Sequence, residues 1–349
     1  MLVVEDSKVA CLLLVHLLES DPRICVIGSV GDGEAALDFL KNSRPDVVLM
    51  DIHMPRLDGF EATRRIMETQ PVPIVICSAN MDVKDTAIVF RAMEAGAIAC
   101  IEKPLRRGHE HFEATAAHLL ETVRLMSEVK VVRRTARTGR PASAAAVVSG
   151  SAGAAQTQRA AANVKVVGIG ASTGGPPVLQ TILAALPKDY PVPILIVQHI
   201  ADGFLPGMAD WLNQTTALQI HIASYGTQPL PGHVYLAPDD FHMGIGPGGA
   251  IVLTREAALS HLRPAVSALF RSLAEVHGPN ALGVLLTGMG KDGAAELKLL
   301  RDKGAVTIAQ DRESSAVHGM PGVAIALGGA SHVLAADAIG PALIALTKR

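Results

Sequence analysis

The sequence is poor in aromatic residues: only 3 % of its 349 residues are Phe, Trp or Tyr, and Trp211 is the single tryptophan. Side chains on which nucleic-acid bases could stack are therefore scarce. A large charge of either sign is also missing, since 31 Lys and Arg stand against 33 Asp and Glu, for a net charge of −2. This balance gives no reason to expect nucleic acid or an anionic membrane as a partner.

Long hydrophobic runs are missing as well. No apolar run reaches the roughly 18 residues that a membrane-spanning helix needs, so membrane insertion is not expected. Glu5 and Asp6 lie where a secretory signal would carry basic residues. The four cysteines all lie in the first third of the chain and form no Cys-x-x-Cys pair. Reduced thiols in a cytoplasmic protein fit this usage better than a disulfide framework.

The first part of the chain, residues 1–126, alternates short apolar runs with amphipathic helical stretches. Five such runs, each followed by a helix, predict a parallel doubly wound (βα)5 domain. The runs are Leu2–Val4, Cys25–Gly28, Val47–Met50, Ile74–Cys77 and Ile98–Ile101. Residues 127–163 are first basic and then rich in Ala, Ser and Gly, which predicts a flexible linker.

A second domain is predicted over residues 164–349. Its buried-strand candidates have helical stretches between several of them, which indicates a mainly parallel sheet. These candidates are Val164–Gly170, Ile194–Val197, His233–Leu236, Gly283–Leu286 and Ala305–Ala309. The predicted fold class is therefore α/β, with two doubly wound domains.

Polar residues follow four predicted strands of the first domain: Glu5 and Asp6, Asp51, Ser78, and Lys103. In parallel α/β sheets, function gathers beyond the carboxyl ends of the strands. Three converging carboxylates need a cation, and their hard oxygen ligands suit Mg²⁺. Asp51 could then attack phosphorus, while Lys103 and the Ser78 hydroxyl receive the phosphoryl oxygens. A single strand-end acid would more simply cap the following helix, so the joint placement favours a phosphoryl site.

Together with Asp51-Ile-His-Met-Pro-Arg-Leu-Asp-Gly59, this pattern resembles a two-component receiver domain over residues 1–126. The resemblance implies Asp51 as the phosphorylation site, Ser78 and Lys103 as switch residues, and Glu5, Asp6, Asp51 and the His53 carbonyl as metal ligands. Asp6 and Asp51 should contact the metal directly, and Glu5 through water.

The chain departs from the receiver pattern at two places. Cys100 stands three residues before Lys103, where many receivers carry Tyr or Phe, so an aromatic rotamer switch is not expected. The first strand also begins at Met1, shorter than the family pattern, which suggests that a few residues precede the given start.

A serine marks the second domain. Gly168-Ile-Gly-Ala-Ser172-Thr-Gly-Gly175 lies where an apolar strand meets a helix beginning near Pro176. Glycines relieve crowding at such a turn, and N–H groups at the helix start can stabilise an oxyanion. A serine hydroxyl needs a base. His199 follows the next strand, and Asp292 lies in a glycine-rich loop after a later one, where it could orient the imidazole.

Other interpretations of the serine turn remain at this point. A dinucleotide site would need G-x-G-x-x-G, but Thr173 occupies the third glycine position, and Gln198-His199 replaces the acid after the second strand. Gly170-Ala-Ser-Thr-Gly174 matches the nucleophile elbow of α/β-hydrolases acting on small esters, but that fold orders its triad Ser, acid, His. A helix-capping Ser172 and a packed histidine would be the simplest alternative.

Several motifs spread over residues 164–345 resemble the catalytic domain of the chemotaxis protein-glutamate methylesterase family. They are Gly168–Gly175, Val197–Ile200, Gly232–Met243, Arg263-Pro264 with Leu269–Ser272, Leu286–Gly293, and Ala309–Asp311 with Gly319–Pro321. The resemblance implies Ser172 as nucleophile, His199 as general base and acid, and Asp292 as orienting acid. It also implies the Met289 backbone in oxyanion stabilisation and Thr173 beside the nucleophile. Ala265 and His318 depart from the pattern, outside the triad.

The combined resemblance implies a phosphorylation-activated carboxylic ester hydrolase. It would demethylate glutamate methyl esters on methyl-accepting chemoreceptors, releasing methanol, and deamidate selected receptor glutamines through an acyl-enzyme. A chemotaxis histidine kinase would be the phosphodonor. Mg²⁺ would serve only the receiver, and the esterase reaction would need no cofactor. The alternative is a non-catalytic response regulator whose C-terminal module only binds a partner, which the joint presence of serine, histidine and aspartate disfavours.

Overall fold

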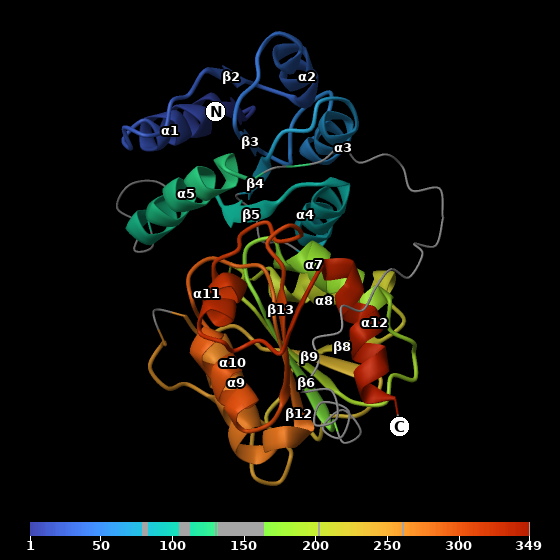
Figure 1. The fold of residues 1–349 in the computed structure, drawn as a ribbon. Helices are drawn as coiled ribbons and strands as arrows, with labels where there is room; N and C mark the ends of the chain where they lie inside the picture. The colour runs from blue at the N-terminus through green and yellow to red at the C-terminus, as the bar shows by residue number, and fades with distance from the viewer. Residues whose placement is uncertain are drawn as a thin grey trace. The chain divides into compact units, whose positions relative to one another are not determined.

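The computed structural model describes residues 1–78, 83–104, 112–129, 131, 164–201, 203–259 and 262–348, with the backbone alone at 83–88 and 114. The chain forms two compact units, Met1–Ala142 and Ser143–Arg349 (Figure 1). Most of the predicted linker 127–163 lies outside the described residues. The domain limits at 126 and 164 therefore stay predictions.

The first unit contains a five-stranded sheet in which every neighbouring pair is parallel. In spatial order the strands are β2 (Gly28–Val30), β1 (Leu2–Val4), β3 (Val48–Met50), β4 (Ile74–Ser78) and β5 (Ala99–Glu102). The helices pack in two groups, α1 (Lys8–Leu18) with α5 (Phe112–Ser127), and α2 (Gly33–Asn42), α3 (Gly59–Thr69) and α4 (Val83–Ala95) together. The predicted (βα)5 architecture is confirmed.

The second strand of this sheet is displaced from its predicted position. The apolar run suggested Cys25–Gly28, whereas β2 begins at Gly28. Leu2 pairs with Gly28 in the ladder, and Ile27 N donates to Met1 O over 2.9 Å. The strand therefore starts where its partner β1 starts, because an edge strand is defined by its ladder rather than by hydrophobicity.

The second unit contains a seven-stranded sheet, again with only parallel neighbours. Its spatial order is β14 (His332–Leu334), β13 (Val306–Gln310), β12 (Ala281–Leu285), β6 (Val166–Ala171), β7 (Ile194–Gln198), β9 (His233–Leu236) and β8 (Gln219–Ile222). One helix group comprises α7 (Gly175–Ala184), α8 (Leu205–Thr215) and α12 (Ala336–Thr347). The other comprises α9 (Val266–Val276), α10 (Ala294–Asp302) and α11 (Met320–Ala326), and a 3-10 turn, η1 (Gly278–Asn280), precedes β12. The second predicted doubly wound domain is thus confirmed (Figure 1).

The sequence did not reveal four strands of this unit. The edge strands β8 and β14 are partly exposed and lack a continuous apolar run. The strands β10 (His242–Ile245) and β11 (Ile251–Thr254) form an antiparallel hairpin outside the main sheet, packed on α9. Buried central strands give a clear hydrophobic signal, while short edge and hairpin strands with polar residues or glycine among their few apolar ones do not.

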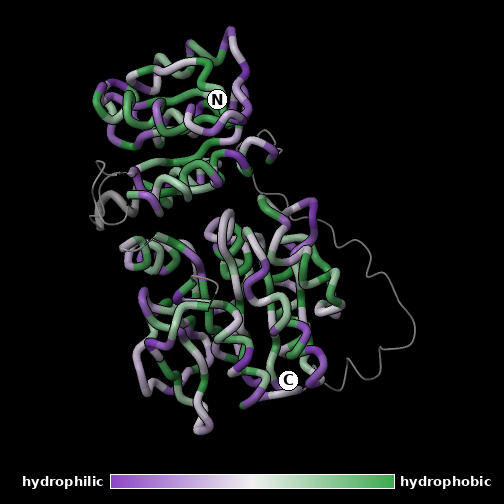
Figure 2. The backbone as a smooth tube through the Cα atoms, turned by 90° about the vertical axis from the view of Figure 1, so that its left-hand side faces the viewer, coloured by the Kyte–Doolittle hydropathy of each residue, from purple (hydrophilic) through white to green (hydrophobic). Residues whose placement is uncertain are grey.

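Two glycines let α9 approach the central strand β6. An added Cβ at Gly168 would lie 2.4 Å from Leu273 Cδ1, and one at Gly170 would lie 2.3 Å from Val266 Cγ1. The first turn of α9 is therefore held against the end of β6, just before Ser172. Figure 2 shows hydrophobic residues concentrated along the strands inside each unit. Within the described residues, no helix is long and apolar enough to cross a membrane.

Candidate functional site

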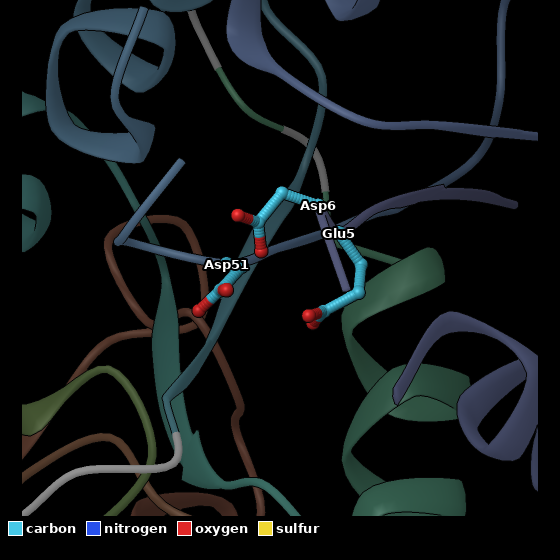
Figure 3. A group of neighbouring side chains, drawn as sticks. All are labelled: Glu5, Asp6 and Asp51. Atoms are coloured by element: carbon cyan, nitrogen blue, oxygen red, sulfur yellow. The ribbon is translucent and has the colours of Figure 1, made fainter. Parts of the chain in front are cut away.

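The three predicted metal-binding carboxylates lie together at the carboxyl edge of the first sheet. Glu5 and Asp6 follow β1 and Asp51 follows β3, and one carboxylate oxygen from each lies within 4.8 Å of the others (Figure 3). Glu5 and Asp51 are buried, whereas Asp6 is exposed. Three hard oxygen donors so close together, one of them open to solvent, form a donor set suited to a divalent cation that keeps some of its waters.

Lys103 joins this cluster from the end of β5. Its Nζ lies 2.7 Å from Glu5 Oε2 and 3.1 Å from Asp51 Oδ2. Burial raises the pKa of the Glu5 carboxyl above its ordinary value, although the Lys103 ammonium opposes this. Burial alone would lower the pKa of Lys103, but its contacts with Glu5 and Asp51 outweigh burial and raise it. Lys103 is thus a stable cation beside the predicted phosphoryl acceptor.

Ser78 ends β4 with a buried hydroxyl, and within the described residues this hydroxyl has no hydrogen-bond partner. Buried hydroxyls are normally paired, so this one is compatible with a site for a bound group. His53 lies two residues after Asp51 in the same loop, with an exposed side chain. The structure thus brings Glu5, Asp6, Asp51, Ser78 and Lys103 to four neighbouring strand ends, and the role of the His53 carbonyl stays a prediction.

The loop after Asp51 is fixed by a glycine and an aspartate. An added Cβ at Gly59 would lie 2.0 Å from the Asp51 carbonyl oxygen, so only glycine fits there. Gly59 N donates to Ile52 O over 3.0 Å, which folds the loop back onto the end of β3. Asp58 caps α3 by accepting from Glu61 N at 2.8 Å. The side chain of Asp58 is therefore engaged in the cap and not in the cluster.

Ser172 lies on the turn between β6 and α7. Gly174 adopts a positive φ of 76° as the N-cap of α7, a conformation that favours glycine. Ser172 N donates to Thr287 O over 3.0 Å, and Gly175 N donates to Ser172 O over 2.8 Å. The predicted sharp strand-to-helix turn is present, and α7 begins one residue before the predicted start at Pro176.

His199 leaves the neighbouring strand at the same level as Ser172. Ala171 of β6 pairs with Gln198 of β7, so Ser172 and His199 are the next residues on two adjacent strands. His199 N donates to Ala171 O over 2.9 Å. The Gln198 side chain donates from Nε2 to Ser172 O at 2.9 Å and to His199 O at 2.7 Å. One buried amide group thus ties the serine turn to the histidine.

Asp292 reaches the histidine from the loop after β12, on the other side of β6. Its Oδ2 lies 3.0 Å from His199 Nε2, and its side chain is only 5 % exposed. Burial would raise the pKa of the Asp292 carboxyl, but hydrogen bonds from His199 and Ser267 lower it below its usual value. The carboxylate also lies at the N-terminus of α9, where the helix dipole favours a negative charge.

The ring orientation assigns different roles to the two imidazole nitrogens. Nε2 faces Asp292, which leaves Nδ1 for the serine. Within the described residues, no hydrogen bond joins the Ser172 hydroxyl to the His199 ring, although their backbones are adjacent. Catalytic hydrogen bonds are often long without substrate and tighten when it binds. The arrangement is compatible with the predicted nucleophilic acyl transfer, and the roles of the three residues stay predictions.

The loop that carries Met289 also contacts the serine. An added Cβ at Gly288 would lie 2.7 Å from Ser172 Cβ, so the backbone entering Met289 lies beside the predicted nucleophile. The Thr287 hydroxyl donates to Thr173 O over 2.9 Å, which fixes the residue after Ser172. This position is compatible with an oxyanion role for the Met289 backbone, and that role stays a prediction.

Sequence reasoning missed the side chains that hold these residues in place. Gln198, Thr287 and Ser267 each contact a predicted site residue or its backbone. Gln198 could have been noticed as a polar residue ending an apolar run next to His199. Ser267 gives no local signal, because it lies 25 residues from Asp292 in sequence and meets it only in the folded unit.

Comparisons with known proteins agree with both units. Residues 167–343 match the CheB methylesterase family, and residues 1–111 match the response regulator receiver domain. A protein-glutamate methylesterase/protein-glutamine glutaminase of Nitrosospira multiformis is 54 % identical over 347 residues, covering 98 % of this chain and 95 % of that protein. A similarly named protein of Geobacter metallireducens is 51 % identical over 346 residues, covering 99 % and 98 %.

Among solved structures, the CheB methylesterase catalytic domain of Thermotoga maritima is 40 % identical, with a TM-score of 0.51, and covers 52 % of this chain and 98 % of that chain. The prediction of a hydrolase is confirmed, and the alternative of a non-catalytic binding module is wrong. The relatives align along nearly the full length. The chain therefore belongs to the CheB methylesterase family and carries an N-terminal response regulator receiver domain.

Proposed function

We propose that this chain is a phosphorylation-activated hydrolase that demethylates glutamate methyl esters on chemoreceptors and deamidates selected receptor glutamines. The observation that carries the proposal is the 3.0 Å pair between His199 and Asp292, formed where Ser172 leaves the adjacent strand. The names of the relatives from Nitrosospira and Geobacter contain both activities. We place the enzyme in the cytoplasm, where the receptor segments and a histidine kinase would be accessible.

The proposed reaction starts with proton transfer from Ser172 Oγ to His199 Nδ1. Asp292 holds the ring through Nε2–H and stabilises the imidazolium. The serine oxygen attacks the γ-carbonyl carbon of the methylated glutamate, and the carbonyl electrons move to an oxyanion beside the Met289 backbone and the start of α7.

Collapse of this tetrahedral intermediate breaks the bond to the methoxy oxygen. His199 returns its proton to that oxygen, so methanol leaves and an ester on Ser172 remains. Water then attacks the ester carbon and gives one proton to His199. As the bond from this carbon to the Ser172 oxygen breaks, His199 passes that proton to the Ser172 oxygen, and the product acid releases its remaining proton to solvent as the glutamate carboxylate. With glutamine as substrate the leaving group is ammonia.

In the receiver, we propose Asp51 as the residue that takes the phosphoryl group from a kinase histidine. Asp6 and Asp51 would hold Mg²⁺ directly, Glu5 would do so through water, and the His53 carbonyl would complete the ligands. The cation would neutralise charge on the transferring phosphoryl group. Lys103, whose Nζ lies 3.1 Å from Asp51 Oδ2, and the Ser78 hydroxyl, which has no hydrogen-bond partner within the described residues, would bind the phosphoryl oxygens.

The test is mass spectrometry of methylated receptor peptides incubated with the full chain. The wild-type protein should remove the methyl group, and S172A should not. The variant should keep its thermal stability within about 1 kcal/mol, because a turn hydroxyl contributes little packing. Full methyl removal by S172A would refute the assigned nucleophile, and failure of the folded wild-type chain on every methylated peptide would refute the substrate class.

A further inference from the structure

The Asp292 carboxylate has two partners besides His199, Val266 and Ser267, both in the first turn of α9. Ser267 offers Oδ1 both its backbone N–H, at 3.0 Å, and its hydroxyl, at 2.5 Å. Val266 N donates to Oδ2 over 2.6 Å, on the same oxygen that faces His199. Both carboxylate oxygens are thus held from α9, and Ser267 supplies every hydrogen bond that Oδ1 receives within the described residues.

The Ser267 hydroxyl has only one proton for two neighbouring carboxylates. Its Oγ lies 2.5 Å from Asp292 Oδ1 and 2.8 Å from Glu296 Oε2, and it accepts from Gly293 N over 3.0 Å. Arg271 Nη2 forms an ion pair with the other Glu296 oxygen at 3.0 Å. The positive charge of Arg271 offsets part of the negative charge of Glu296, which makes Glu296 a weaker acceptor for the Ser267 proton. The shorter contact and the neutralised competitor both direct the Ser267 proton to Asp292.

This arrangement fixes the plane of the Asp292 carboxylate. The two oxygens turn together about one bond, so the hydrogen bonds to Oδ1 also set the direction in which Oδ2 faces His199. Without the hydroxyl, Asp292 would keep the backbone N–H groups of Val266 and Ser267 but lose its shortest hydrogen bond, and its plane would be held less tightly. Gly293 N on the same hydroxyl also anchors the residue after Asp292. The serine therefore acts on both the side chain and the backbone of the acid.

We infer that Ser267 is a positioning residue of the esterase, which sets the orientation of Asp292 and through it of His199. The inference rests on the proposed Ser-His-Asp function of this site. Ser267 itself does not touch the reacting atoms. Its loss should therefore slow turnover without weakening substrate binding, since an interaction made through the acid matters most when the imidazolium forms.

The experiment compares S267A, S267T and S272A in the full-length chain, measuring kcat and KM on methylated receptor peptides. S267A should lose roughly 10- to 100-fold in kcat, as for a hydrogen bond to a charged group, with KM within about twofold. S267T keeps a hydroxyl and should restore kcat to within about fivefold of wild type.

The matched control is Ser272, which lies on the same helix and also has a hydroxyl with two hydrogen bonds, one donated to Leu269 O and one accepted from Ile245 N. Within the described residues, Ser272 forms no hydrogen bond with a triad member, so S272A should keep its kcat.

A double variant separates positioning from simple loss of structure. If Ser267 acts through Asp292, adding S267A to D292N should change the residual kcat by less than about twofold, because coupled residues are not additive. Wild-type kcat in S267A, an equal loss in S272A, or a full further loss in the D292N background would each overturn the inference. An active S172A would instead overturn the proposed function on which it rests.

Discussion

At the residue scale, the structure around the site depends on the hydrogen bonds that the Asp292 carboxylate accepts. Asp292 accepts backbone N–H groups from Val266 on one oxygen and from Ser267 on the other. An asparagine there would turn its own NH₂ group toward one of those N–H groups in either orientation. D292N should therefore lower the free energy of unfolding by about 1–3 kcal/mol, and kcat by roughly 10³- to 10⁴-fold.

The pH dependence of that stability loss has a definite sign. Hydrogen bonds hold the pKa of Asp292 below its usual value, so its stabilising contribution is present above the pKa of the unfolded chain, about 4. The contribution is lost as the pH falls through the lower pKa of the folded state. The stability difference between wild type and D292N should be full at pH 7 and shrink below about pH 4.

Urea unfolding followed by tryptophan fluorescence would measure this difference in the catalytic unit alone. The single tryptophan, Trp211, is buried in α8 of that unit. A difference that stays constant down to pH 3 would contradict an ionised Asp292 as the source of the stabilisation. S172A is the matched control, and its stability should follow the wild type at every pH.

The phosphorylation site gives a second residue-scale prediction. A small phosphodonor with a magnesium salt should place one phosphoryl group on Asp51, and D51N should prevent it. S78A should slow the reaction, because the phosphoryl oxygens would lose a hydrogen-bond donor. K103A should leave the label but uncouple it from esterase activation. Intact-mass and peptide mass spectrometry would locate the label, and finding it on Asp58 or a histidine would refute the assignment.

At the element scale, the turn after β3 depends on the close approach of Gly59 to the Asp51 carbonyl. G59A should destabilise the receiver unit by about 2 kcal/mol or more, because its Cβ would collide with backbone rather than with a flexible side chain. It should also slow phosphorylation of Asp51. G31A is the matched control, since an added Cβ there meets nothing within 4 Å. Thermal unfolding would compare them, and equal stability of both variants would show that the turn relaxes at little cost.

The sequence was informative about elements whose signal is local. The buried central strands and the glycine-flanked serine turn were predicted because hydrophobic runs and glycines report directly on them. The edge strand β8 was not, since three of its four residues are exposed, and the hairpin β10–β11 was not, since each strand has four residues and His242 and Gly244 interrupt the hydrophobic run. In the site, residue types and order made Ser172, His199 and Asp292 candidates, and the resemblance to the methylesterase family implied their roles. The hydrogen bonds from Gln198 to Ser172 and from Ser267 to Asp292 join residues 26 and 25 positions apart, so the sequence does not show these pairings.

At the scale of the whole molecule, the receiver unit is expected to regulate the activity of the esterase unit. We expect the unphosphorylated receiver to restrain the esterase, with the predicted linker 127–163 keeping it at high effective concentration. A fragment spanning residues 160–349 should then be folded and more active than the unphosphorylated full chain, and insensitive to phosphodonor. Its folding is expected because it contains a complete sheet with both helix groups.

Methanol release by the fragment and by the full chain, with and without phosphodonor, would measure this restraint. A tenfold difference corresponds to about 1.4 kcal/mol, a modest coupling between two parts of a protein. The matched control is D51N in the full chain, which should stay at the restrained rate when phosphodonor is added. A folded fragment no faster than the unphosphorylated full chain would mean that the receiver acts only as an activator.

The order of strands in the second sheet also determines when each of the three site residues is synthesised on the ribosome. The chain builds outward from β6 in one direction first, through β7 to β9 and β8, and only later returns to add β12, β13 and β14 on the other side. Ser172 and His199 therefore emerge early, whereas Asp292 follows His199 by 93 residues. Because domains fold as they are synthesised, a nascent or truncated chain would carry a serine and a histidine without their acid. Activity would thus appear only when the last third of the protein has been made and docked.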